Sequence, residues 1–306
     1  MMRNPRIAII TDDPGWQGRE LRRAFAERHW DSHYVSLTGC RIDLHGPTAQ
    51  IILPGFDGQL PGGVFVRGVS GGTLEQVIFR LNVLHALRES DIVVYNDARA
   101  IERTVDKGMT SFLLKRAGIP SPATWVCESP EQARAIAIHE HGCGRSLVLK
   151  PLFGSQGEGI VKIDEPGALL QLNDFKGIYY FQEFIDKPDG DWHDWRVLVI
   201  DGRARAAMAR RSRHWITNRA QGGYCEPALL EPRLAELAEA AARAVDIDYA
   251  GVDLILDSEH RYLVTEVNSI PAWRGLQSVC NGDIAGWLAD HFLARVAAQS
   301  RTEAVS

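Results

Sequence analysis

The chain has 306 residues and a net charge of −5. This length allows two or three domains with cores that fold without disulfide bonds or structural metal ions. This mild acidity gives no general attraction to nucleic acid or to an anionic membrane, so neither is expected as a partner. No apolar run is long enough for a membrane span, and the N-terminal residues do not have the pattern of a signal-peptide h-region. Together with five scattered cysteines that form no C-x-x-C pair, this predicts a reduced, cytoplasmic protein.

Residues 1–95 are predicted to form an α/β domain, because strand and helix patterns alternate along them. Residues 6–11 and 62–66 have the pattern of short buried strands, and a helix is expected from the turn at 12–15 to about His29. Thr73 and Gln76 have capping-box spacing, which predicts a second helix to about Arg88, before a third strand at 92–95. The first turn is not Gly-x-Gly-x-x-Gly, which argues against a Rossmann dinucleotide site.

Residues 96–184 are predicted to form a second portion that begins with one long helical segment, which has apolar residues at helical spacing from Ile101 to Leu113 and is terminated by Gly118 and Pro120. Strands at 123–126 and 146–150 flank a helix around 131–140. A glycine loop at 153–159 then leads to a strand at 160–163, a helix near Leu169 and a strand at 179–185. Residues 185–306 add strands at 195–200 and 204–210, a helix at 232–245 with proline at its first position, a hairpin, and a last amphipathic helix from about Asp283.

The hairpin at 251–268 carries oxygen ligands on one face. A connecting loop at 258–261 would make Leu256 face Leu263 and place Asp253 directly opposite Glu266. Asn268 falls on the same face because side chains alternate along a strand. Three oxygen donors suit Mg²⁺ with a bound phosphate chain, whereas the alternative is a set of edge-strand groups that simply face water.

The glycine loop follows Lys150 and lies between two strands, so its backbone N–H groups could cradle a phosphate chain. It is not a P-loop, because the lysine precedes the glycines and no helix follows. Arg210 or Arg211, in a basic stretch, could hold a transferring phosphoryl group. The alternative for the glycine loop is an ordinary hairpin turn, and the alternative for the basic stretch is a solvated edge. No Ser-His-Asp or Cys-His constellation has a local signature.

Taken in order, these motifs resemble the ATP-grasp superfamily, and specifically its RimK-like α-L-glutamate ligases. The resemblance runs from the first strand to beyond Asn268. It implies an α+β / α/β, three-domain ATP-grasp architecture: a Rossmann-like pre-ATP-grasp domain at 1–95, a central subdomain at 96–184 and a C-terminal subdomain at 185–306, with the nucleotide held between the last two. The motifs that carry it are Asp106-Lys107 at the opening of a helix, Lys150 before Gly154-Ser-Gln-Gly-Glu-Gly159, Gln182-Glu-Phe-Ile185, Asp194-Trp-Arg196, Asn218 and Asp253 with Glu266-Val-Asn268.

The resemblance also implies roles for single residues. Lys107 and Lys150 would contact ATP phosphates, under a loop that contains Gly157 and Gly159. Glu183 and Phe184 would form the adenine hinge, Asp194 would contact the nucleotide, and Asn218 would contact the triphosphate. Arg210 or Arg211 would bind the phosphoryl group. The ligands of two Mg²⁺ or Mn²⁺ ions would be Asp253, Glu266 and Asn268.

The implied reaction is an ATP-dependent joining of a carboxylate to the amine of L-glutamate through an acyl phosphate. Residues 67–73 are similar to the subgroup linked to tetrahydromethanopterin modification, so the expected acceptor is a pterin-type C1 carrier, then a protein C-terminus such as that of a ribosomal protein, then another coenzyme. The segment 269–275 departs from the family pattern, with Trp273 and Arg274 where the acceptor should approach. Arg67 and Arg274 are candidates for holding the acidic substrates, and the alternative for each is a surface charge.

Two other functions stay open from the sequence. One is a different ATP-grasp chemistry, such as a peptide or D-amino-acid ligase. The other is a non-catalytic ATP-binding regulator, against which the retained lysines and metal-type residues argue. The oligomeric state also stays open, with a homo-oligomer among the alternatives.

Overall fold

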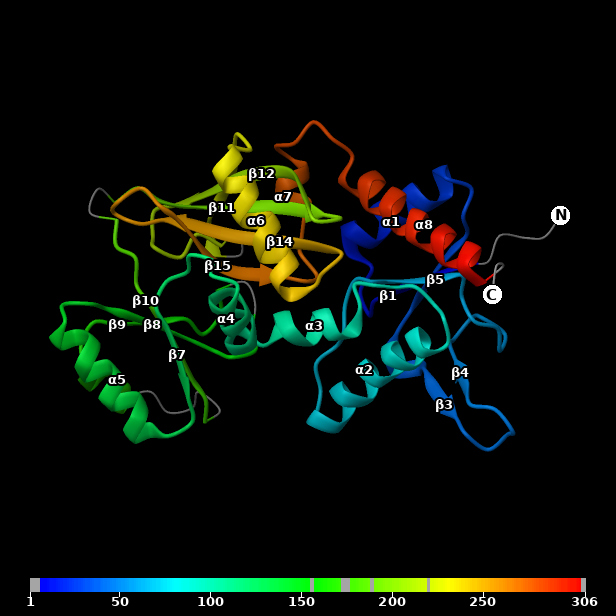
Figure 1. Cartoon of the computed structure of the whole chain (residues 1–306), viewed down its shortest axis with the longest axis horizontal. Helices are drawn as coiled ribbons and strands as arrows, with labels where there is room; N and C mark the ends of the chain where they lie inside the picture. Colours follow the sequence, from blue (N-terminus) through cyan, green and yellow to red (C-terminus); the bar gives the residue numbers. More distant parts are fainter. Residues whose placement is uncertain (1–5, 155–156, 172–176, 188–189, 219–220, 304–306) are drawn as a thin grey trace.

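The computed structural model describes residues 6–154, 157–171, 177–187, 190–218 and 221–303 (Figure 1). The strands form three sheets of four or five strands and one small two-stranded sheet. Within the described residues, no helix is both long and apolar enough to cross a membrane.

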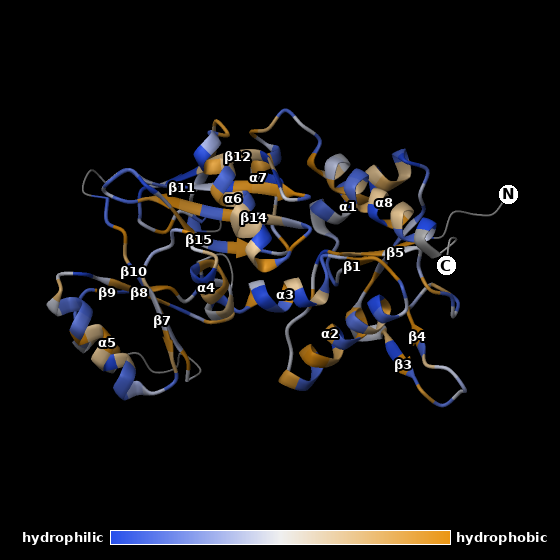
Figure 2. Ribbon diagram, viewed as in Figure 1, coloured by the Kyte–Doolittle hydropathy of each residue, from blue (hydrophilic) through white to orange (hydrophobic). Residues whose placement is uncertain are grey.

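The first sheet is parallel and has the strand order β2-β1-β5-β6. It consists of β1 (Ile7–Ile10), β2 (Ser32–Val35), β5 (Gly63–Val66) and β6 (Val94–Tyr95). β1 and β5 are fully buried, and their colour in Figure 2 shows that they are mostly apolar. Since the chain leaves β1 toward β2 and later returns to its other side as β5, the strand order reverses between β1 and β5.

The helices and the small sheet of this portion surround the parallel sheet. They are α1 (Gly15–Glu27), α2 (Leu74–Glu89), the 3₁₀ turn η1 (Leu37–Gly39), β3 (Arg41–Asp43) and β4 (Gln50–Ile52). The predicted capping box is confirmed, with Thr73 and Gln76 each accepting the other's backbone N–H at the start of α2. β2, β3 and β4 were not predicted, because each has only three or four residues and none is apolar throughout.

The long helix predicted after residue 96 is wrong in one respect, since the chain forms two helices there. α3 (Ala98–Val105) ends before Asp106, and α4 (Lys107–Arg116) begins after it. The Asp106 side chain accepts a hydrogen bond from the Met109 backbone N–H at 3.0 Å, which is an N-cap contact. The break therefore places Lys107 at the first position of a new helix.

The second sheet is antiparallel and has the order β7-β10-β8-β9. Its strands are β7 (Thr124–Cys127), β8 (Leu147–Lys150), β9 (Val161–Ile163) and β10 (Tyr179–Glu183). Helix α5 (Pro130–Gly142) covers one face through Ala133 and Ala137. The helix predicted near Leu169 is a 3₁₀ segment, η2 (Pro166–Gln171).

The third sheet is antiparallel and has the order β13-β12-β11-β14-β15. Its strands are β11 (Trp192–Ile200), β12 (Arg203–Ser212), β13 (Tyr224–Pro227), β14 (Tyr249–Leu256) and β15 (Tyr262–Asn268). Helix α6 (Pro232–Val245) packs its alanine- and leucine-rich side on one face of this sheet. The opposite face is apolar at one end, near Trp273 and the short helix α7 (Arg274–Gln277), and charged at the other end.

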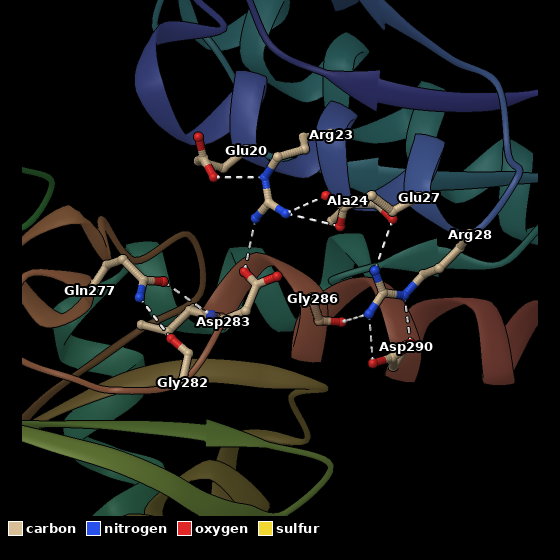
Figure 3. Close-up of polar contacts among 11 residues, drawn as sticks. Glu20, Arg23, Ala24, Glu27, Arg28, Gln277, Gly282, Asp283, Gly286 and Asp290 are labelled. Atoms are coloured by element: carbon tan, nitrogen blue, oxygen red, sulfur yellow. Dashed lines mark hydrogen bonds and ion pairs between the residues drawn. The ribbon is translucent and has the colours of Figure 1, made fainter.

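The last helix, α8 (Ile284–Glu303), returns to the first portion and lies beside α1 (Figure 1). Figure 3 shows polar contacts at this junction: Arg23 of α1 pairs with Asp283, just before α8, at 3.1 Å, and Arg28, just after α1, pairs with Asp290 of α8 at 2.5 Å. Each sheet uses strands from only one of the predicted portions, while α8 leaves the third portion to pack on the first. The boundaries near residues 95 and 184 remain predictions.

The hairpin of β14 and β15 has a register that differs from the prediction near its tip. Leu256 pairs with Tyr262, one residue earlier than expected, and an irregularity between Asp253 and Leu254 then restores the predicted pairing of Asp253 with Glu266. The extra residue lets Val264 and Val267 both face α6. Glu266 and Asn268 consequently share the opposite face with Asp253.

Candidate active site

A cavity lies between the second and third sheets, and most of the predicted site residues line it. Its walls come from α4, the end of β8, the hinge after β10, and strands β11, β12, β14 and β15. The predicted residues in its lining are Lys107, Lys150, Gly157, Glu183, Phe184, Asp194, Arg210, Asn218, Asp253 and Glu266.

Two lysines stand at one end of the cavity. Lys150, the last residue of β8, donates a hydrogen bond from Nζ to Gln182 Oε1 at 2.6 Å. Burial lowers the pKa of the Lys150 ammonium to about 8. Lys107 donates from Nζ to the backbone oxygen of Gly154 at 2.7 Å, and burial also lowers its pKa. Among the described residues, neither ammonium group pairs directly with a carboxylate. A bound polyanion would therefore stabilise the charged forms of both lysines.

The glycine loop meets Asn218 at the cavity. A Cβ at Gly157 would lie 2.9 Å from Asn218 Oδ1, and the φ of +76° at Gly157 also favours glycine. Gly159 does not line the cavity, and its close neighbour is Pro151. Part of the predicted loop, residues 155–156, lies outside the described residues.

The predicted hinge forms an aromatic wall. The ring centroid of Phe184 lies 5.7 Å from that of Trp192 and 5.6 Å from that of Trp215. Lys162 Nζ lies 4.2 Å from the centroid of the Phe184 ring, within cation–π range. Glu183, Phe184 and Ile185 all line the cavity. This wall offers the flat, mostly apolar surface that a purine base requires.

The floor of the cavity is a buried network of charges on β11 and β12. Arg210 donates two hydrogen bonds to Asp194, at 2.7 and 2.5 Å, and Thr217 Oγ1 donates to the same carboxylate at 2.8 Å. Burial lowers the pKa of the Arg210 guanidinium, but Asp253 and Asp194 outweigh burial and raise it above its ordinary value. Arg210 is therefore a permanently charged and rigidly held group.

Asp253 on β14 joins the same network. It accepts two hydrogen bonds from Arg196, at 2.7 and 2.6 Å, and lies 3.0 Å from Arg210 Nη2. Burial raises the pKa of this carboxyl group, but Arg196 and Arg210 outweigh burial and hold the pKa below its ordinary value. Asp253 is consequently ionised and compensated inside the protein.

Glu266 and Asn268 complete the predicted oxygen set. Asn268 does not line the cavity itself, but in the amide orientation that satisfies both atoms it donates to Glu266 Oε1 and accepts from Arg196 Nη2, each at 3.3 Å. The hairpin thus brings two carboxylates and an amide to one face, a donor set that fits a hard divalent cation. Their chemistry agrees with the predicted metal role.

The two predicted arginines separate on the strand. Arg210 faces the cavity, whereas Arg211 faces away, is half-buried and pairs with Asp191 at 2.5 Å and Glu226 at 2.6 Å. Alternation along β12 puts neighbouring residues on opposite faces, so only one of the pair could serve the site. The second arginine at the site is Arg196, whose role the sequence did not single out. The sequence does place Arg196 on the same face of its strand as Asp194, because side chains alternate along a strand.

The two arginines proposed to hold acidic substrates also differ. Arg274, at the start of α7, is exposed. Arg67 is half-buried at the end of β5, with its guanidinium carbon 4.7 Å from the centroid of the Trp273 ring. The first and third sheets therefore meet at Arg67.

The fold is that of the ATP-grasp ligases. The solved structure of the ATP-grasp ligase PsnB with minimal precursor, Mg and ADP superimposes with a TM-score of 0.71, at 22% identity, over 95% of this chain and 98% of that one. The crystal structure of a RimK domain ATP-grasp protein from Sphaerobacter thermophilus gives a TM-score of 0.69, at 22% identity, over 94% and 99% of the two chains.

The family follows from the sequence. Residues 104–292 match the family model of the RimK-like ATP-grasp domain, so the chain belongs to that family. It is 37% identical, over 94% of its length and 98% of the relative's, to the tetrahydromethanopterin:alpha-L-glutamate ligase of Methanococcus maripaludis. It is also 34% identical, over 94% of both chains, to a probable alpha-L-glutamate ligase of Legionella pneumophila. The protein is an ATP-dependent ligase that forms carbon–nitrogen bonds.

Proposed function

We propose that this ligase joins the amine of L-glutamate to a carboxylate of an acidic acceptor, and that the acceptor is a tetrahydromethanopterin-type C1 carrier. The observation that carries the proposal is the convergence of cations, carboxylates and an aromatic wall from two sheets on one cavity. The name of the Methanococcus relative supports both substrates, and the name of the Legionella relative supports glutamate; the two matches cover 94% of this chain at 37% and 34% identity. The C-terminus of a protein, such as a ribosomal protein, and another coenzyme are the next candidates for the acceptor.

ATP is proposed to lie along the cavity with its base against Phe184 and its phosphates toward the lysines. Lys107 and Lys150 would contact the phosphates, and the loop at Gly157 would close over them with Asn218 at its side. Asp194 would act on the nucleotide side mainly by holding Arg210 in place. These roles give a function to both the lysines and the aromatic rings around the cavity.

Asp253, Glu266 and Asn268 are proposed to hold magnesium, as two ions, or manganese in its place. When bound, the metal neutralises charge on the phosphates and polarises the transferring group. Arg196 and Arg210 already compensate Asp253, so they keep the ionised ligand stable inside the fold. The mixture of carboxylates and amide leaves room for phosphate oxygens and water in the coordination shell.

The chemistry needs no nucleophilic side chain. An oxygen of the acceptor carboxylate attacks the γ-phosphorus, the bond to the bridging oxygen breaks, and ADP leaves. The glutamate amine then attacks the acyl carbon of the acyl phosphate, inorganic phosphate leaves, and the amine gives up a proton. The fixed guanidinium of Arg210 would stabilise the negative charge on the transferring phosphoryl group.

The test is ADP formation with each substrate omitted in turn. The proposal expects full activity only with ATP, Mg²⁺, the acceptor and L-glutamate together, and little activity with other amino acids in place of glutamate. Equal ADP formation without any acceptor, or equal turnover with D-alanine, would contradict it. ATP binding without any turnover would favour a non-catalytic regulator instead.

A further inference from the structure

Arg67 stands at a special place in the first sheet. The strand order of this parallel sheet reverses between β1 and β5, and open α/β sheets bind ligands outside the carboxyl ends of strands at such a point. Arg67 follows the last residue of β5, and its backbone N–H donates to the oxygen of Ile10, the last residue of β1, at 2.8 Å. The side chain of Arg67 therefore begins at the switch point itself.

The guanidinium of Arg67 is fixed in place but not neutralised. It stacks on Trp273, and Nη1 donates a hydrogen bond to the backbone oxygen of Pro271 at 3.3 Å. The buried Tyr249 hydroxyl lies close by and donates to Val66 O at 3.0 Å. No acidic side chain pairs with Arg67 within the described part of the chain. A half-buried planar fork without a carboxylate is well suited to receive one.

Trp273, on which Arg67 stacks, lies in the segment that follows the β14–β15 hairpin. Trp273 is 1% exposed, and its indole Nε1 has no hydrogen-bond partner among the described residues. Pro271 packs against Gly251, where an added Cβ would lie 2.9 Å from the Pro271 Cβ. Gly251 pairs with Asn268 in the hairpin. Arg67 is thus connected to the proposed metal-binding strands through Pro271.

The loop after Arg67 is also held firmly. Arg80 on α2 is buried and donates from Nη1 to the backbone oxygens of Ser70 at 2.8 Å and Gly71 at 2.7 Å. The capping box of Thr73 and Gln76 fixes the end of the same loop. The surface around Arg67 is therefore organised before any ligand arrives, which lowers the entropic cost of binding.

We infer that Arg67 binds a carboxylate of the acceptor and determines the ligase's preference for acidic acceptors. Arg67 does not line the ATP cavity, and it lies at the junction of two sheets, so the site suits the larger of the two acidic substrates rather than the amino acid. Arg274 is exposed and does not share this position. The inference rests on the proposed function.

The test compares Arg67→Gln and Arg67→Lys with a matched control, Arg22→Gln. Arg22 also stacks on an aromatic ring, that of Tyr34 at 5.6 Å, which belongs to the edge strand β2 and not to the switch point. Initial rates are measured with tetrahydromethanopterin and, separately, with a peptide that ends in glutamate. Loss of a charged hydrogen bond in Arg67→Gln should raise the KM for the acceptor by about 10- to 100-fold. The KM values for ATP and L-glutamate should stay within about twofold, Arg67→Lys should recover part of the loss, and Arg22→Gln should match the wild type.

Calorimetric titration of the same acceptors into each variant separates this inference from the proposed function. If the wild type does not ligate but binds an acceptor that Arg67→Gln binds at least about tenfold more weakly, the binding role stands and the reaction is wrong. If the wild type ligates and Arg67→Gln has an unchanged acceptor KM, or instead a raised KM for glutamate, the inference is overturned while the reaction stands. If the wild type and Arg67→Gln bind the acceptor equally, or if neither binds it, the inference is also overturned.

Discussion

Arg196 donates two hydrogen bonds to Asp253, from Nε at 2.7 Å and from Nη2 at 2.6 Å, so a carboxylate proposed to bind metal is already paired inside the protein. Arg210 lies 3.0 Å away on the other side of the same carboxylate. A magnesium ion bound at Asp253 must share it with two guanidinium groups. The charges at the site therefore compensate one another, and removing one of them leaves another without its partner.

Asp253→Asn is expected to abolish ADP formation and also to destabilise the fold. Removing one member of a buried ion pair leaves the other uncompensated and costs about 3–5 kcal/mol. Urea unfolding of the variant should show a loss of this size. An unchanged free energy of unfolding would show that the Arg196–Asp253 pair does not stabilise the fold.

Glu266→Gln is the cleaner test of the metal role, because Glu266 is half-buried and forms no ion pair among the described residues. We expect ADP formation to fall by at least about 100-fold, as for other groups that stabilise phosphoryl transfer, with stability close to that of the wild type. Binding of Mn²⁺ in the presence of an ATP analogue, followed by electron paramagnetic resonance, should weaken in parallel. Wild-type Mn²⁺ binding by the variant would remove Glu266 from the metal site.

Arg210 and Arg211 should behave differently although they are neighbours. Arg210→Lys keeps the charge but loses the two-pronged contact with Asp194, and we expect kcat to fall by about 100-fold or more. Arg211→Lys alters only a partly exposed ion-pair set and should change kcat by less than about threefold. Steady-state ADP formation measures both variants. A larger effect at Arg211 would contradict the strand alternation on which the assignment rests.

Lys150 should take up a proton when nucleotide binds near pH 8. Burial lowers its pKa to about 8 in the folded protein, and phosphate charge would raise it again. Binding at pH 8 should therefore take up about half a proton, and affinity should weaken as the pH rises above 8. Calorimetry in two buffers of different ionisation enthalpy measures the uptake. Identical binding enthalpies in both buffers, or an unchanged uptake in Lys150→Met, would contradict the assignment.

The stability of the folded protein should also follow the pKa of Lys150. Between about pH 8 and the unfolded pKa near 10.4, the unfolded chain holds one more proton than the folded chain. The contribution of Lys150 to the free energy of unfolding therefore rises with pH across this window. Below pH 8 the lysine is charged in both states, and the full cost of burying its charge is present.

Asn96 should be important for the contact between the first and third sheets. Its Nδ2 donates to Tyr249 O at 2.8 Å and Ser269 O at 2.6 Å, and its Oδ1 accepts from the N–H groups of Asp248 and Tyr249 at 3.1 Å each. Asn96→Ala leaves four buried backbone groups unsatisfied and should lower the free energy of unfolding by at least about 3 kcal/mol. Thermal and urea unfolding measure the loss. A near-neutral effect would show that the junction does not depend on this amide.

Local patterns in the sequence predicted much of the fold and the polarity of the site. The pairing of Asp253 with Glu266 was predicted correctly although the loop was placed one residue too late, because the irregularity after Asp253 compensates the error. Helical spacing continues across Asp106, so the apolar pattern predicted one long helix, whereas the family motif at Asp106-Lys107 implied that a helix begins there. The structure agrees with the motif, because the Asp106 side chain caps α4.

Contacts between distant segments could not be predicted in this way. Arg196 and Asp253 lie on different strands, and only the register of the third sheet brings their side chains together. Arg67 and Trp273 belong to different portions of the chain, and no local pattern relates them. The return of α8 to α1 likewise depends on packing across the whole molecule.

The most direct test of the proposed function is mass spectrometry of the acceptor after reaction. Purified protein is incubated with ATP, Mg²⁺, L-glutamate and tetrahydromethanopterin, with a glutamate-ended peptide as the second acceptor. The account predicts that the pterin gains the mass of one or more glutamyl units, and that omitting ATP or using Glu266→Gln prevents the gain. An acceptor of unchanged mass, in a sample that hydrolyses ATP at the same rate with and without glutamate, would contradict it.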